Sequence, residues 1–184
     1  MAAAPTSIPT KTAIFAGGCF WCMQPSFDAM AGVVSTTVGY TGGHVENPTY
    51  EQVSTDTTGH YEAIAITYDP SSVSYEQLLP IYWENIDPLD AGGQLADRGQ
   101  HYQTAIFYAD EAQKTAAETS KQTIEAKFAP KPVATKILPA KTFYPAEDYH
   151  QKYYQKNKLR YNAYKYGSGR VDRLGELWGD ENNK

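Results

Sequence analysis

The two cysteines of the chain lie three residues apart, in the segment Gly18-Cys19-Phe20-Trp21-Cys22. Cysteines at this spacing on a helix can be bridged, so one thiol could attack a substrate and the other could close a disulfide behind it. An apolar run at residues 13–16 and two glycines come first, which predicts that Cys19 lies at a turn from a strand into a helix. The N-terminus of a helix stabilises a thiolate. Cys19 is therefore the expected nucleophile, and Cys22 is the candidate resolving thiol.

Two other interpretations of this pair stay open. A buried cysteine behaves as a small hydrophobic residue, and a Phe-Trp pair is common core material, so both thiols could be inert. A Cys-X-X-Cys segment can also supply two of the four ligands of a zinc site. The chain has no further cysteine, however, and its four histidines do not offer the usual spacing for a second ligand pair. We therefore expect no metal.

Glu62 is a candidate proton donor because of its place in an expected strand, Tyr61–Tyr68. Alternation along this strand puts Glu62 on the same face as Ile64 and Ile66. If this face is buried, the loss of solvent raises the pKa of the carboxyl and makes it an acid at neutral pH. The alternative, equally open on the strand pattern, is that Glu62 turns to solvent or pairs with a lysine.

The composition is that of an ordinary globular protein, with 184 residues, 41% of them hydrophobic, and a net charge of −5. This charge argues against binding to nucleic acid or to an anionic membrane. No apolar run is long enough to cross a bilayer, and the start of the chain does not resemble a secretory signal. Two cysteines so close together cannot form a disulfide framework. A cytoplasmic location is expected, and a periplasmic origin with the signal removed stays open.

The elements that must position these residues follow from periodicity and turn signals. Strands are expected near residues 12–16, 33–40, 61–68, 104–108 and 133–138. Helices are expected near residues 19–30, 74–85, 110–128 and 147–157, and an irregular tail is expected from Gly167 onward. Strands interleaved with helices predict an α/β fold, specifically an α+β two-layer sandwich, with a mixed sheet in a single catalytic domain over residues 1–184.

Six short motifs occur in order along the chain. They are Gly17-Gly18-Cys19-Phe20-Trp21-Cys22, Gly39-Tyr40-Thr41-Gly42-Gly43, Asn47-Pro48-Thr49-Tyr50, Thr58-Gly59-His60-Tyr61-Glu62-Ala63, Asp97-Arg98-Gly99-Gln100-His101-Tyr102 and Ala146-Glu147-Asp148-Tyr149-His150. Together they make the chain resemble the type A peptide methionine sulfoxide reductases, over residues 12 to 178. The resemblance implies a compact α/β domain that reduces the S epimer of methionine sulfoxide, free or in proteins.

The resemblance also implies roles for the aromatic residues beside the first cysteine. Cys19 would attack the sulfoxide sulfur, while Phe20 and Trp21 would hold the S-methyl group of the substrate. Ordinary core packing of the two aromatic residues is the alternative.

Further roles follow from the same resemblance. A sulfoxide oxygen leaves only when it is protonated, and Glu62 with the hydroxyls of Tyr50 and Tyr102 is similar to the proton-donor set of the family. Asp97 would meet the amide or amino group of the substrate. His150 matches a motif position and is a candidate for substrate binding, although a structural role is as consistent with the sequence.

Oxygen transfer would leave Cys19 as a sulfenic acid, which condenses readily with a nearby thiol. Many relatives resolve this acid with a cysteine in the C-terminal tail, whereas here Cys22 is the only internal candidate. The family's recycling implies that thioredoxin or a similar dithiol protein reduces the resulting disulfide, without a bound cofactor. Resolution by an external small thiol or glutaredoxin is the alternative.

Two rival functions account for part of the pattern. A general thiol-disulfide oxidoreductase would need the cysteine pair but neither Glu62 nor the tyrosines. A non-catalytic module that binds methionine sulfoxide would use the aromatic residues without turnover. Neither explains the ordered set of motifs, and we expect a monomeric enzyme.

Overall fold

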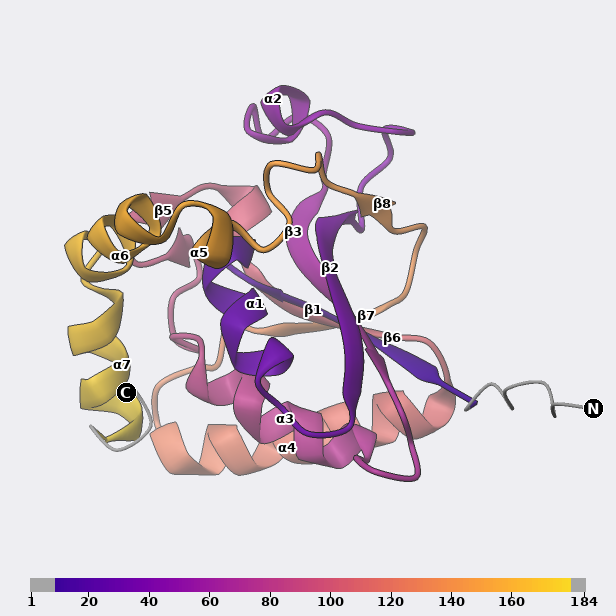
Figure 1. Ribbon diagram of the computed structural model, residues 1–184. Helices are drawn as coiled ribbons and strands as arrows, with labels where there is room; N and C mark the ends of the chain where they lie inside the picture. The colour runs from indigo at the N-terminus through magenta and orange to yellow at the C-terminus, as the bar shows by residue number, and fades with distance from the viewer. Residues whose placement is uncertain (1–8, 180–184) are drawn as a thin grey trace, which may run out of the picture.

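The computed structural model describes residues 9–179, which are organised around a six-stranded sheet (Figure 1). Its strands are β1 (Lys11–Gly17), β2 (Val33–Thr41), β3 (Tyr61–Tyr68), β6 (Thr104–Tyr108), β7 (Lys136–Pro139) and β8 (Tyr144–Pro145). They lie in the order β7-β6-β1-β3-β2-β8, and every neighbouring pair is antiparallel except β6 with β7, which is parallel. The short strands β4 (Gly93–Gln94) and β5 (Asp97–Arg98) form a separate antiparallel ribbon. The predicted mixed sheet is thus confirmed.

Alternate residues of the central strand β3 face two different layers, as strand geometry requires. Ile64 and Ile66 are fully buried in the main core, whereas Tyr61 and Ala63 belong to a smaller cluster on the other face. Glu62 therefore shares the face of the main core, and only 2% of the residue is exposed. The burial that the alternation of this strand suggests is confirmed.

Three helices cover the face of the sheet that carries the main core. They are α1 (Phe20–Asp28), α3 (Tyr75–Glu84) and α4 (Glu111–Phe128). The other helical elements are α2 (Tyr50–Val53), the 3₁₀ turn η1 (Gln100–Tyr102), α5 (Tyr153–Lys156), α6 (Lys158–Gly167) and α7 (Arg170–Trp178). Figure 1 shows α5, α6 and α7 gathered beside α1 at one end of the molecule. Of the helices in residues 9–179, none has the length and apolar character needed to cross a bilayer.

The predicted helix over residues 147–157 is wrong for its first half. Lys152 has a positive φ of 54°, which a continuous right-handed helix does not allow, and only Tyr153–Lys156 are helical. The side chain of Gln151 instead holds the preceding segment against β2: its Oε1 accepts from Val38 N at 2.9 Å, and its Nε2 donates to Val38 O at 2.8 Å. Side-chain hydrogen bonds to β2 replace the helix at this point.

The predicted irregular tail after Gly167 is also wrong, because α7 occupies Arg170–Trp178. A polar helix of this length is marginal alone and depends on tertiary contacts. Arg173 Nε pairs with Asp87 Oδ2 at 2.7 Å, and Trp178 Nε1 donates to the carbonyl of Ile86 at 3.0 Å. These contacts join α7 to the chain that follows α3, far away in the sequence. The result is one α+β domain with helices on the main face of a mixed sheet.

Candidate functional site

Residues from six separate elements line one cavity of about 220 Å³ near the end of β1. The lining residues are Cys19, Phe20, Trp21, Tyr50, Glu62, Asp97, Tyr102 and Tyr164. All of them except Tyr164 were singled out from the sequence. A larger groove of about 560 Å³ lies between α3 and α4, but no thiol lines it. The cavity at the end of β1 is therefore the candidate active site.

The turn that carries Cys19 depends on glycine. β1 ends at Gly17, and Gly18 has a φ of +79°, a conformation that L-residues adopt only with strain. A Cβ on Gly18 would also lie 2.5 Å from the Cβ of Gln94. Cys19 follows directly as the residue before α1, with 6% of its surface exposed. The predicted strand-to-helix turn is confirmed, and it places the thiol in the wall of the cavity.

Glu62 lies behind this turn as a buried acid. Its Oε2 accepts the backbone N–H of Phe20 at 3.1 Å, which ties β3 to the first turn of α1. Burial raises the pKa of the carboxyl to about 8, because the ionised form loses its hydration. The nearby negative charge of Asp97 acts in the same direction. Glu62 therefore carries a proton at neutral pH and can give it to a group in the cavity.

The two thiols differ in acidity, in the order opposite to the one expected from the helix N-terminus. Burial raises the pKa of Cys19 well above its usual value, and the interaction with Cys22 adds to this shift. The pKa of Cys22 is lowered to about 7, first by the hydrogen bond from Cys19 and then by the positive charge of Arg170. Loss of solvent outweighs the field of the helix end at Cys19. A negative charge on the pair is thus more favourable on Cys22 than on Cys19.

Cys22 does not line the cavity. It is 5% exposed and packs beside Tyr153 and Tyr161 of the C-terminal helices, with Trp21 at the edge of this cluster. Its thiol interacts with that of Cys19. The arrangement puts one sulfur at the cavity and the second directly behind it.

Tyr50 and Tyr102 bring two hydroxyl groups to the side of the cavity near Glu62. Their hydroxyls interact with each other, and burial raises the pKa of both. Glu147 Oε1 accepts the backbone N–H of Tyr50 at 2.9 Å and holds α2 over the site. Both phenols stay protonated at neutral pH, so they are donors for an oxygen bound near Glu62.

Asp97 and Tyr164 close another side of the cavity. The hydroxyl of Tyr164 donates to Asp97 Oδ2 and also interacts with the Cys19 thiol. Burial raises the pKa of Asp97, while the bond from Tyr164 opposes this shift. Tyr164 lies on α6, which the sequence patterns do not predict. The signal available for it was the crowding of seven tyrosines among residues 144–166.

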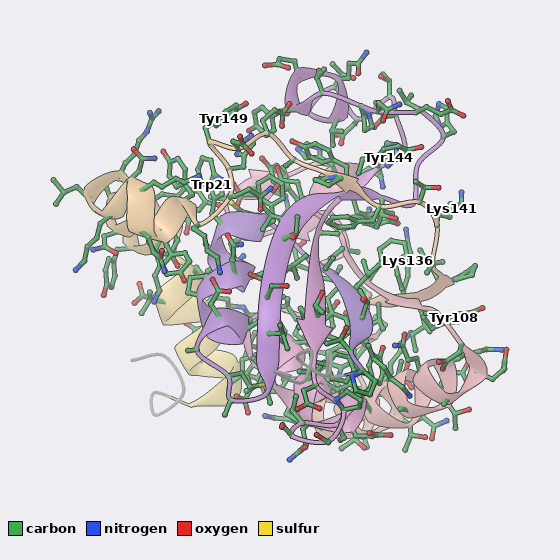
Figure 2. All side chains as sticks on the ribbon, turned by 45° about the vertical axis from the view of Figure 1, so that its right-hand side comes forward. Trp21, Tyr108, Lys136, Lys141, Tyr144 and Tyr149 are labelled. Atoms are coloured by element: carbon green, nitrogen blue, oxygen red, sulfur yellow. The ribbon has the colours of Figure 1, made fainter. Side chains whose placement is uncertain are left out.

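Trp21 and His150 form a pair beside the cavity. The indole N–H of Trp21 donates to His150 Nδ1 at 3.0 Å, and the indole ring stacks on Tyr153 with the ring centres 3.8 Å apart. Figure 2 shows Trp21 where α1 meets the C-terminal helices. His150 is 1% exposed and is not a lining residue. The structure therefore places His150 behind Trp21, where it orients the indole, and not in the substrate cavity.

Within residues 9–179, no group of three or more His, Cys, Asp or Glu side chains is arranged to hold a metal ion. The chemistry that the described side chains supply is that of a nucleophilic thiol with adjacent proton donors.

Comparisons with known proteins agree on one family. The family model described as "Peptide methionine sulfoxide reductase" matches residues 11–182. The chain is 52% identical over 175 residues to the "Peptide methionine sulfoxide reductase MsrA" of Bacillus licheniformis, which covers 95% of this chain and 97% of that protein.

Solved structures agree. One is methionine sulfoxide reductase A of Corynebacterium diphtheriae, with 34% identity and a TM-score of 0.75 over 85% of this chain and 79% of that one. Another is Mxr1 of Saccharomyces cerevisiae in reduced form, with 27% identity and a TM-score of 0.76 over 85% of this chain and 90% of that one.

Proposed function

Since the chain belongs to the peptide methionine sulfoxide reductase family, we propose that it reduces the S epimer of methionine sulfoxide, free or in proteins. One observation carries this proposal above the others. A thiol, Cys19, and a buried carboxyl that is protonated at neutral pH, Glu62, share one small cavity with aromatic walls. A sulfoxide needs both groups, because its sulfur accepts a nucleophile only as its oxygen accepts a proton.

The walls of the cavity suggest how the substrate is held. Phe20 and Trp21 offer an apolar surface for the S-methyl group, and the bond to His150 keeps the indole in place. Asp97, which also lines the cavity, is the acceptor for the amide or amino group of the substrate. Each of these contacts fixes the sulfur next to Cys19 and lowers the entropic cost of the reaction.

In the chemical step, the sulfur of Cys19 attacks the sulfoxide sulfur and Glu62 protonates the oxygen as the S–S bond forms. The Glu62 carboxylate takes up the proton that the Cys19 thiol releases. Hydrogen bonds from Tyr50 and Tyr102 stabilise the charge that develops on this oxygen. The S–O bond of the substrate and the bond between the two sulfurs then break, the hydroxyl passes to Cys19 as a sulfenic acid, and the substrate leaves as methionine. Cys19 loses two electrons and the sulfoxide gains them, so the step needs no other redox partner. General acid catalysis of this kind contributes about 10²- to 10⁴-fold.

For recycling, we propose that Cys22 attacks the sulfenic acid, which releases water and closes a Cys19–Cys22 disulfide. The interaction between the two thiols supports this step. Thioredoxin or a similar dithiol protein would then reduce the disulfide, so no bound cofactor is required. Mxr1 of yeast, to which the chain is similar, has been solved in complex with Trx2. Resolution by an external thiol would make Cys22 dispensable.

Domain organisation, oligomeric state and location concern the whole chain. We propose a single catalytic domain over residues 1–184 that works as a monomer, because the residues of one chain supply the thiol, the proton donors and the aromatic walls that the reaction needs. The function needs the thiols to be returned to the reduced form, which suits a reducing compartment such as the cytoplasm. Nothing in the proposal involves nucleic acid or a membrane.

The test is mass spectrometry of alkylated protein after one equivalent of methionine-S-sulfoxide, without reductant, on the wild type and on Cys22→Ser. We expect one methionine and loss of both thiols in the wild type, and one methionine with a trapped sulfenic acid in the variant. An unchanged thiol count without methionine would refute the reductase function. A sulfenic acid that persists in the wild type would refute internal resolution alone.

A further inference from the structure

A buried cation lies beneath the cysteine pair, and the mechanism above does not use it. Arg170, the first residue of α7, is 3% exposed. Its Nη1 donates to the carbonyl of Asn85 at 2.6 Å, while its Nε has no partner among the described residues. None of the ion pairs found within residues 9–179 includes it. A buried guanidinium without a carboxylate partner is costly, and this cost calls for an explanation.

The guanidinium faces the turn that carries the first cysteine. Its Nη2 is 3.5 Å from the carbonyl of Gly17 and 3.3 Å from the position that a Cβ on Gly18 would occupy. The anionic forms of Cys22, Tyr164, Cys19 and Asp97 are the groups whose charges favour its positive charge, and Cys22 has the largest effect of the four. Arg170 is thus placed to compensate a negative charge on the cysteine pair.

The second cysteine needs such compensation more than the first. Cys22 is enclosed by the rings of Tyr153 and Tyr161, where a thiolate would have little solvation. Charged and titratable groups act on it from the residue before α1 and from β3, β5, α6 and α7. They are Cys19, Glu62, Asp97, Tyr161, Tyr164, Lys165 and Arg170. Arg170 is the larger of the two cationic influences, and Lys165 is the smaller.

We infer that Arg170 is a positioning residue that keeps Cys22 as a thiolate and thereby drives the resolution of the Cys19 sulfenic acid. This inference rests on the proposed function. The Cys22 thiolate attacks the Cys19 sulfur, the S–S bond forms as the S–OH bond breaks, and the departing hydroxide takes a proton and leaves as water. The sulfenic acid is reduced and the thiolate is oxidised, so no further reactant enters. Arg170 acts on this step and not on oxygen transfer.

The expected size of the effect follows from the acidity of Cys22. Loss of an opposite charge nearby raises a pKa by about 1–3 units, and each unit lowers the thiolate fraction about tenfold. A more basic thiolate is also more nucleophilic, which recovers about half of the loss on a logarithmic scale. For a shift of about 2 units, disulfide formation in Arg170→Met is expected to slow about tenfold near pH 7.

The experiment follows both steps in one sample, with methionine-S-sulfoxide added to the reduced full chain. Methionine release is measured by rapid quench, and the sulfenic acid is trapped with dimedone at set times and counted by mass spectrometry. The variants are Arg170→Met, of similar length without charge, and Arg170→Lys, which keeps the charge. We expect methionine release within about threefold of the wild type in both variants, and a sulfenic acid about tenfold longer-lived only in Arg170→Met.

The pH profile separates this role from a structural one. In Arg170→Met, disulfide formation should regain the wild-type rate when the pH is raised by about 2 units. An unshifted profile, or a sulfenic acid in Arg170→Lys that lives as long as in Arg170→Met, would overturn the inference. A loss of both steps together in both variants would show a purely structural residue and would also overturn it. Absence of methionine in the wild type would instead refute the proposed function.

Discussion

Replacement of Glu62 by Gln should slow turnover strongly and, at the same time, stabilise the fold. Burial raises the pKa of this carboxyl from 4.5 to about 8. Between these two values the folded chain holds a proton that the unfolded chain has released. Folding therefore takes up a proton, and the free energy of unfolding falls as the pH rises through this interval. An amide of the same shape does not titrate, so this contribution disappears in the variant.

The magnitude follows from the same shift. One pKa unit corresponds to about 1.4 kcal/mol. At pH 7 the carboxyl of the unfolded chain is ionised, and the pH lies about 2.5 units above its pKa of 4.5. Keeping Glu62 neutral in the folded chain therefore costs roughly 3 kcal/mol. The amide oxygen of Glu62→Gln can still accept the Phe20 N–H, which now lies 3.1 Å from Oε2. We expect the variant to gain up to roughly 3 kcal/mol in free energy of unfolding at pH 7, while methionine release falls about 10²- to 10⁴-fold.

The assay is urea unfolding, followed by tryptophan fluorescence at pH 5, 7 and 9, combined with single-turnover release of methionine. Glu118→Gln is the matched control, because Glu118 is exposed on α4 and its replacement should change stability by less than about 0.5 kcal/mol. If Glu62→Gln is less stable than the wild type at pH 7, and if its free energy of unfolding depends on pH as in the wild type, the carboxyl is ionised in the folded protein. Undiminished methionine release would refute its role as the acid.

Three further variants test separate parts of the site. His150→Ala leaves the indole N–H of Trp21 without its acceptor. KM should therefore rise about fivefold or more, while the single-turnover rate at saturating substrate changes little. A single-turnover rate that falls by the same factor as KM rises would contradict the orienting role. Tyr164→Phe removes the hydrogen-bond donor to Asp97. In steady-state kinetics, KM for a peptide sulfoxide should rise about tenfold. An unchanged KM would show that the Asp97–Tyr164 pair takes no part in substrate binding. Asp110→Ala removes the N-cap of α4 and should lower the free energy of unfolding by about 1 kcal/mol in urea, with activity unchanged; a matching loss of activity would mean that α4 influences the site.

The parts of the fold that follow short-range rules could be predicted from the sequence. Strand β3 was expected at its observed bounds, Tyr61–Tyr68, because five of its eight residues are tyrosine, isoleucine or threonine and the segment ends at the turn signal Asp69-Pro70. Its alternation led to the burial of Glu62. The glycines before Cys19 marked a turn that the structure shows with a positive φ at Gly18. These features depend only on neighbours in the chain.

The C-terminal quarter could not be predicted in the same way. Helix α7 exists because Arg173 and Trp178 find partners at Asp87 and Ile86, and no local pattern announces such contacts. The sequence alone does not reveal these partners, and without them Gly167 and the polar residues after it are typical of an irregular tail.

The sequence by itself determined which chemistry this protein carries, since the cysteine pair and the ordered motifs specify a thiol enzyme and name seven of the eight residues around its cavity. Only the tertiary structure decided how these groups behave. Burial raises the pKa of Cys19 and Glu62, while Arg170, about 150 residues further along the chain than either cysteine, helps to lower the pKa of Cys22. The reason is physical: residue types set the reactions that are possible, whereas acidity depends on solvent and on charges that folding brings together.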